Sequence, residues 1–193
     1  THGCSGRGVT WVATRHGIGL AGFLLACGLW APGSSGAQTL GRAELLSASR
    51  DIMSAAPYVA LATVDARGRP AVRAMDAEAP GEDMVVWLAT NPSSRKVRQI
   101  RAEPQVALYY LDADGPGYVT LVGSARLVDE PAQKARHWKE SWTPFYPDRD
   151  ESVVLIQVTP LWLEIVSVPH GANGDPEDWR ADIVEFVVGT SGR

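Results

Sequence analysis

The protein has 193 residues, enough for a single domain with a substantial hydrophobic core. Its net charge of −4 weighs against nucleic acid as the main partner, because phosphate backbones select strongly basic surfaces. Both cysteines, Cys4 and Cys27, lie near the N-terminus, so disulfide or thiol chemistry is confined to that region.

Residues 1–37 have the pattern of a signal peptide. They contain no acid, and their apolar run from Gly17 to Trp30 is too short to span a bilayer comfortably. Small residues follow, with a candidate cleavage site before Gln38. An uncleaved membrane anchor and a lipoprotein modified at Cys27 stay open as alternatives. We expect an exported protein, periplasmic or secreted, with no membrane span after processing.

Residues 38–168 read as one domain of short apolar segments separated by turns. Gly123 is expected to mark a bend or bulge in the longest strand. Residues 169–193 are rich in Gly and Asp, which predicts a loosely attached tail. Strands are predicted at 58–64, 71–77, 84–90, 105–111, 118–128, 152–158 and 161–168, and helices at 43–55, at 91–102 and from about 129 to beyond Trp142.

Six or seven short strands with few helices favour a mainly β fold. Several of the strands are apolar on both faces, which suits a small closed barrel. We therefore predict an antiparallel β-barrel with flanking helices. The helix between the third and fourth strands is expected to lie beside the barrel opening.

That helix begins with an unusual charge pattern. Asn91 is suited to the N-cap and Pro92 to the first helical position. The first turns then carry Arg95 and Lys96, and no acid. Cations at a helix N-terminus oppose the helix dipole by about 0.3–1 kcal/mol each. A bound anion, such as a phosphate held also by Ser94, would resolve the conflict; the alternative is a solvated basic face.

Arg73 lies inside an otherwise apolar strand. It is either an edge-strand arginine that points to solvent or a second cation for the same phosphate. The second interpretation assumes that its strand pairs with the one that ends at Thr90. Tyrosines such as Tyr109 and Tyr118 fit core packing or contact with a planar ligand, and packing is favoured for them.

The segment from about residue 50 to residue 168 resembles the pyridoxamine 5′-phosphate oxidase-like FMN-binding split barrels. The branch typified by general stress protein 26 is the best match. The resemblance covers about Arg50 to Val168 and combines several weak motifs. These are Arg73-Ala74-Met75, Ala89 to Lys96, Pro104-Gln105-Val106, and Tyr118 to Ala125.

This resemblance implies a six- to seven-stranded split barrel that holds FMN at a homodimer interface. Each implied cofactor contact maps onto a residue of this chain. Arg73, Arg95 and Lys96 match the phosphate ligands, Ala74, Met75 and Asp76 the backbone along the isoalloxazine, Ala89 and Thr90 the ribityl neighbours, and Tyr118 a residue reaching the flavin from the partner; Ser94 adds a hydroxyl.

The C-terminal region departs from the true oxidase, since it lacks the Arg-x-His element that binds the pyridoxal substrate. We therefore expect a flavin-dependent oxidoreductase other than pyridoxamine phosphate oxidase, with no catalytic side chain and no metal site assigned. The alternatives are a non-catalytic flavin-binding stress-response protein, or a haem or deazaflavin binder on the same fold. His137, the sole mid-chain histidine, gives haem thin support.

Overall fold

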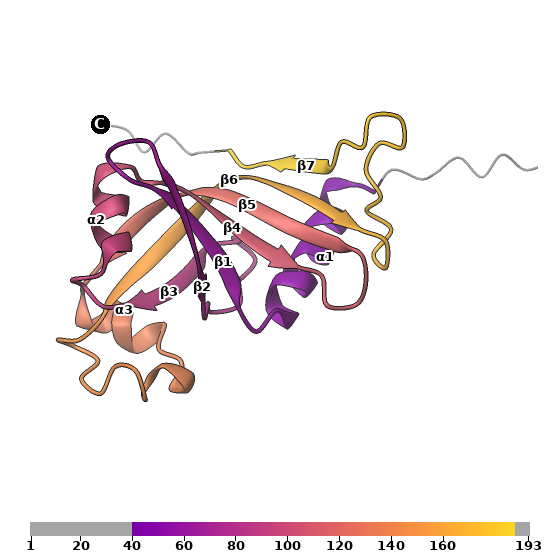
Figure 1. Ribbon diagram of the computed structural model, residues 1–193. Coiled ribbons are helices and arrows are strands. Elements are labelled where there is room, and N and C mark those ends of the chain that lie inside the picture. Colours follow the sequence, from indigo (N-terminus) through magenta and orange to yellow (C-terminus); the bar gives the residue numbers. More distant parts are fainter. Residues whose placement is uncertain (1–39, 188–193) are drawn as a thin grey trace, which may run out of the picture. The chain divides into compact units, whose positions relative to one another are not determined.

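The computed structural model describes residues 40–187, which form an antiparallel seven-stranded sheet with a few helices (Figure 1). The predicted signal peptide, residues 1–37, lies outside the described residues. Within the described range no helix is long and apolar enough to cross a membrane. The elements are α1 (Arg42–Ala55), β1 (Val59–Val64), β2 (Pro70–Met75), β3 (Val86–Thr90), α2 (Arg95–Ala102), β4 (Gln105–Leu111), β5 (Gly117–Val128), α3 (Pro131–Arg136), the short 3-10 helix η1 (Glu140–Trp142), β6 (Val154–Ser167) and β7 (Asp182–Glu185).

The strand order is β2-β1-β4-β5-β6-β3, and β7 adds to β6. The first and last strands meet just beyond the end of β2, where Ala77 bridges to Leu88 and the Glu78 N–H donates to the Trp87 carbonyl at 2.9 Å. The predicted pairing of the Arg73 strand with β3 is therefore wrong along β2 itself. Arg73 pairs with Leu61 of β1, and the barrel closes only after Asp76.

Alternating side chains fill the barrel interior. Leu61, Leu121 and Leu163 come from three different strands and are fully buried. Figure 1 shows α1 across one end of the barrel and α2 beside the other. Each helix turns its apolar residues inward, with Ile52 of α1 and Ile100 of α2 in the same core. The helix beside the opening is thus found where it was predicted.

The β5–β6 pair carries the expected bulge. The register of the two strands shifts between Val122 and Gly123, as the glycine predicts. Pro160 lies opposite Gly123, so β6 continues as one strand from Val154 to Ser167 rather than as the two predicted. Proline has no N–H for the ladder, and a bulge is one of the few places where a strand tolerates it.

The C-terminal segment is attached more firmly than its composition predicts. Strand β7 pairs with the second half of β6, and Val184 is buried. Upstream, the buried Ser167 hydroxyl donates to Asp112 Oδ2 at 2.6 Å, and His170 Nδ1 lies 2.8 Å from the same hydroxyl. The expectation of a loose tail is therefore wrong for this part of the chain.

The helix after β5 is shorter than predicted, because α3 ends at Arg136. The aromatic residues that follow form a second apolar cluster against β3. Trp138 and Trp142 meet edge to face at 5.8 Å, and Trp142 packs with Trp87. Trp142 is buried, so its role in this cluster is packing.

Tyr110 buries a hydroxyl that has no hydrogen-bond partner among the described residues. Burial also raises the pKa of this phenol. Because a buried unpaired polar group costs about 1–3 kcal/mol, we expect Tyr110→Phe to raise the free energy of unfolding by about 1 kcal/mol. Urea denaturation of the two proteins measures the change. A loss of stability would mean that the hydroxyl is hydrogen-bonded in solution.

Candidate functional site

Helix α2 begins one turn later than predicted. The Asn91 side chain accepts the Ser93 N–H at 2.8 Å, which makes a turn before the helix, and Ser94 is the N-cap. The Ser94 hydroxyl does not cap the helix but lies 3.3 Å from the Thr90 hydroxyl. The first turn of α2 thus has neither a side-chain cap nor an acid, so its N–H groups can bind an anion.

Lys96 reaches back from this first turn to the end of β3. Its Nζ donates to the buried Thr90 hydroxyl at 2.9 Å. Burial, and then the neighbouring charges of Arg73 and Arg95, lower the pKa of Lys96. The ammonium group is therefore held beside other cations in a partly desolvated place.

Arg73 is directed to α2 rather than to solvent. Its Nη1 donates to the Leu61 carbonyl at 3.0 Å and to the Thr63 hydroxyl at 2.7 Å, and its Nη2 donates to Gln99 Oε1 at 3.0 Å. A guanidinium carries five N–H donors, so these bonds orient the group and leave two donors for another acceptor. Burial, and then Arg95, lower the pKa of Arg73.

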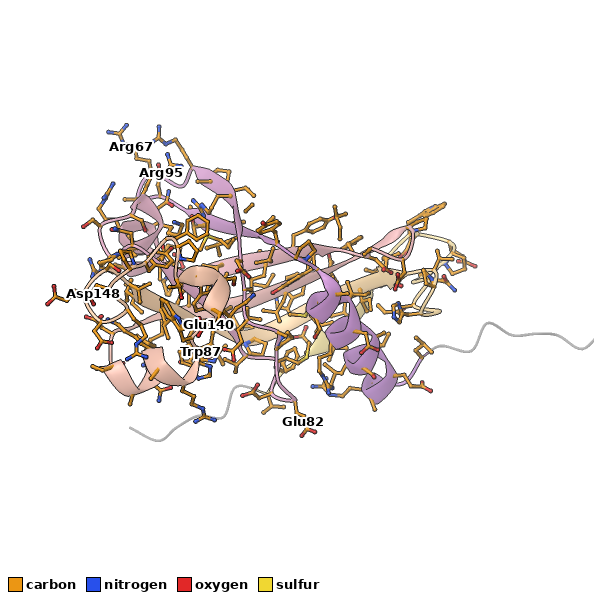
Figure 2. All side chains as sticks on the ribbon, turned by 90° about the horizontal axis from the view of Figure 1, so that it is seen from below. Arg67, Glu82, Trp87, Arg95, Glu140 and Asp148 are labelled. Carbon is orange, nitrogen blue, oxygen red and sulfur yellow. The ribbon has the colours of Figure 1, made fainter. Side chains whose placement is uncertain are left out.

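Arg73, Arg95 and Lys96 form a cluster that we call the cation cluster. Within residues 40–187, no carboxylate lies within 4.0 Å of any of the three. Figure 2 places Arg95 at the same end of the molecule as Arg67 of the β1–β2 turn. Three mutually repelling cations beside two hydroxyls have the charge and the donors to bind a multiply charged oxyanion.

The other predicted cofactor-binding residues lie outside the cation cluster. Ala74 and Met75 complete β2 after Arg73, and Asp76 follows the strand. The Asp76 carboxylate is held by Lys139 and by the Ser141 hydroxyl. Ala89 is buried next to Thr90. Met75 packs against the core, whereas Tyr118 stacks on Tyr109 at 5.4 Å, away from the hydrogen bonds of the cation cluster.

Sequence reasoning missed Thr63 and Gln99, the two buried residues that orient Arg73. Thr63 donates to Gln99 Oε1 at 2.8 Å, so the pair acts as a unit. The sequence spacing gives a weak indication of both residues. Thr63 shares a strand face with Leu61, and Gln99 follows Arg95 by one helical turn, on the same side of α2.

A model of the family described as pyridoxamine 5′-phosphate oxidase matches residues 45–167. The chain belongs to this family. The match covers every predicted cofactor-binding residue, from Arg73 to Tyr118. No curated protein matches the sequence.

Solved structures share the split-barrel fold of the pyridoxamine 5′-phosphate oxidase family. A protein from Clostridium acetobutylicum related to general stress protein 26 is 19% identical, with a TM-score of 0.63, and the match covers 76% of this chain and 97% of that one. General stress protein 26 from Bacillus anthracis is 20% identical, with a TM-score of 0.59 and coverage of 74% and 99%. A heme binding protein from Mycobacterium smegmatis is 18% identical, with a TM-score of 0.57 and coverage of 77% and 59%.

His137, the residue considered for haem, is already engaged on this split barrel. Its Nδ1 lies 2.7 Å from Glu78 Oε2, and its ring stacks on Trp87 with centroids 3.9 Å apart. The side chain is only 14% exposed. These contacts tie the segment after α3 to β3 and favour a structural role for the histidine.

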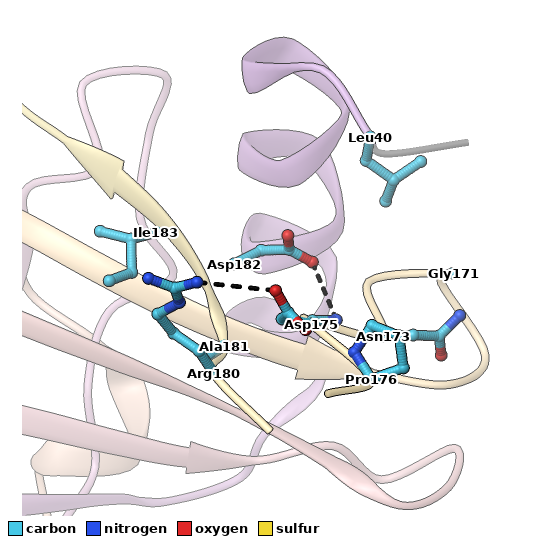
Figure 3. Close-up of a pocket in the computed structure, with 10 residues that line it drawn as sticks. Leu40, Gly171, Asn173, Asp175, Pro176, Arg180, Ala181, Asp182 and Ile183 are labelled. Atoms are coloured by element: carbon cyan, nitrogen blue, oxygen red, sulfur yellow. Dashed lines mark hydrogen bonds and ion pairs between the residues drawn. The ribbon is translucent and has the colours of Figure 1, made fainter. Parts of the chain in front are cut away.

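A pocket of about 470 Å³ lies on the C-terminal segment (Figure 3). Arg180 in its wall is 3.5 Å from Asp175, and Asp182 accepts the Gly174 N–H at 3.2 Å. Arg180 is thus paired with an acid of the same pocket, Asp182 is bonded to the backbone, and no predicted site residue of the family lines the pocket.

Asp65, in the β1–β2 turn beside α2, predicts a pH dependence of stability. The Arg69 side chain, and then the backbone N–H groups of Arg69 and Arg67, lower the pKa of Asp65 to about 2. An acid with a lowered pKa stabilises the fold above its unfolded pKa of about 3.9 and ceases to do so as the pH falls towards 2. We expect Asp65→Asn to lower the Tm at neutral pH and the Tm difference to vanish near pH 2. Thermal unfolding across this pH range checks it, and a constant difference would contradict it.

Proposed function

We propose that this family member binds FMN through the cation cluster and acts as a flavin-dependent oxidoreductase. One observation carries the proposal: Arg73, Arg95 and Lys96 converge without a carboxylate from the described part of the chain. A phosphate monoester brings nearly two negative charges and three acceptor oxygens to such a site. The charge and the acceptor oxygens of the phosphate complement the three cations, which otherwise repel one another.

The residues fit the phosphate end of FMN. Arg73 has two unused N–H donors and is prevented from swinging away by Thr63 and Gln99. Lys96 is fixed by Thr90, and the uncapped first turn of α2 adds backbone N–H groups. The flavin, when bound, supplies the electron transfer, while the protein binds, orients and tunes it.

The segment Ala74 to Asp76 supports a defined place for the isoalloxazine. It continues β2 from the cation cluster, and its last side chain is fixed by Lys139 and Ser141. A backbone held at both ends can position a planar ring. Ala89 and Thr90, in the neighbouring wall, would then lie beside the ribityl chain.

We also propose that the protein works as a homodimer. The outer face of β2, β1 and β4 is apolar, with Ala74, Ala60 and Tyr109 in register across it. Val72 on this face is 64% exposed and Leu111 is 66% exposed. A second copy would cover these side chains and would bring its Tyr118, on the same sheet, towards the flavin. Light scattering of the purified protein, with Leu111→Glu as the disrupting variant, tests the dimer.

The absorption spectrum of the purified protein tests the cofactor. FMN predicts absorption bands at about 370 and 450 nm, which are properties of the flavin itself. A Soret band would instead identify the haem alternative, and a single band at shorter wavelength than 450 nm the deazaflavin alternative. Bleaching by an electron donor and reoxidation by an acceptor separate an oxidoreductase from a non-catalytic flavin-binding protein.

Export of the protein is a further part of the proposal and rests on residues 1–37 alone. We propose that mature protein begins near Gln38. N-terminal sequencing of exported material tests the cleavage. A lipid on Cys27 would show the lipoprotein route instead.

A further inference from the structure

A pocket of about 500 Å³ lies between the β1–β2 turn and α2. Its wall includes Arg95, so it is contiguous with the cation cluster. The pocket is lined on both sides by charged side chains, three of them basic and one acidic. These are Asp65, Arg69, Arg95 and Arg98.

The charges in this pocket do not balance. The Asp65 carboxylate is already taken by Arg69, whose Nε lies at 2.8 Å and Nη2 at 2.7 Å. Arg98 donates to the Ser93 carbonyl at 3.1 Å, and over residues 40–187 no carboxylate lies within 4.0 Å of Arg98. One phosphate monoester, with nearly two charges, does not neutralise the cation cluster and Arg98 together.

Gln99 adds a polar donor to the wall of this pocket. It is only 6% exposed, and its Oε1 accepts hydrogen bonds from Arg73 and from Thr63. Because an arginine can only donate, the Gln99 atom that faces Arg73 is the amide oxygen. The amide nitrogen therefore lies on the side away from Arg73. Among the described residues this nitrogen has no acceptor, and Gln99 lines the pocket. The nitrogen is therefore available as a donor to a ligand oxygen in the pocket.

We propose that this pocket binds a second anionic group, a phosphate or carboxylate adjacent to the phosphate that Arg73 and Lys96 hold. Arg98 and the Gln99 amide supply its donors, and Arg95 lies between the two groups. The inference rests on the proposed phosphate site. The second group belongs either to the cofactor itself, as in the diphosphate of a flavin dinucleotide, or to a free oxyanion, and the recognition chemistry is the same.

Calorimetric titration of the full-length apoprotein with inorganic pyrophosphate and orthophosphate tests the subsite. We expect pyrophosphate to bind about tenfold more tightly, because it reaches both groups of donors. Arg98→Gln should abolish this advantage, whereas Arg101→Gln, on the same helix but outside the pocket, should preserve it. Equal affinities in the unmodified protein, or an advantage that survives Arg98→Gln, would overturn the inference.

Titrations with FMN and FAD separate this inference from the proposed function. FMN binding without a pyrophosphate advantage overturns the subsite and leaves the proposed function standing. A pyrophosphate advantage without flavin binding supports the subsite and removes the proposed function. Where both hold, Arg98-dependent preference for FAD over FMN assigns the second group to the cofactor. Arg98-dependent orthophosphate binding to the FMN-loaded protein assigns it to a free anion.

Discussion

Replacing Arg95 and Lys96 together by alanine is expected to abolish FMN retention and leave the fold intact. Each hydrogen bond from a charged donor contributes about 1.5–3 kcal/mol, so affinity should fall by at least about a hundredfold. Arg95 is exposed, and among residues 40–187 the Lys96 ammonium is bonded to Thr90 alone; neither side chain belongs to the hydrophobic core. Flavin fluorescence on titration with FMN measures the affinity, and circular dichroism checks the fold.

Arg101→Ala is the matched control for the double variant. It removes a cation from the last turn of the same helix, where no predicted cofactor contact lies. We expect FMN affinity within about twofold of the unmodified protein, because one distant, exposed charge is largely screened. Stoichiometric FMN in the double variant would contradict the phosphate site. A similar loss of FMN affinity in the double variant and in Arg101→Ala would show a general effect of positive charge rather than a specific site.

Gly123→Ala is expected to cause a large loss of stability. A Cβ at this position would lie 2.6 Å from the Thr159 carbonyl oxygen and 2.7 Å from Val158 Cγ1. The backbone oxygen belongs to the paired strand and cannot move without breaking the ladder around the bulge. Overpacking of this kind costs about 1–3 kcal/mol, measured as a lower midpoint in urea unfolding.

Gly81→Ala provides the comparison, since the nearest atom to a Cβ there is an Asp83 carboxylate oxygen at 3.4 Å. Its φ angle is not in the left-handed region, so alanine should be accommodated. We expect a change below about 0.5 kcal/mol in the free energy of unfolding. Equal effects of the two variants would show that the close approach at the bulge is relieved in solution.

Strand positions could be predicted well because apolar alternation and turn residues dominate this chain. Gln105–Leu111 was predicted without error, and Gly123 correctly indicated the bulge. The break assumed at Pro160 was wrong, because a proline ends a strand only where the ladder needs an N–H at that position. Here the bulge at Gly123 removes that need.

The C-terminal strand could not be predicted from composition. Four residues, Asp182 to Glu185, contain too little alternation to stand out in the sequence. They form a strand because they pair with the half of β6 that does not pair with β3. The pairing partner is a tertiary feature, since β6 is long enough to serve β3 at one end and β7 at the other.

The charge pattern of α2 predicted its role as a candidate anion site, but not the residues that aim Arg73. A local conflict, cations at an uncapped helix start, is visible in sequence because it breaks a rule about neighbours. The support from Thr63 and Gln99 crosses from β1 to α2 and depends on the barrel register. Such contacts follow from the closed fold and not from spacing along the chain.

The most direct test of the central claim compares FMN with riboflavin as ligands of the apoprotein. The two differ only in the phosphate, so their affinity ratio isolates the contribution of Arg73, Arg95 and Lys96. We predict that FMN binds at least about a hundredfold more tightly than riboflavin at low salt, with the ratio falling as ionic strength rises. Equal affinities of FMN and riboflavin would contradict a phosphate site at the cation cluster.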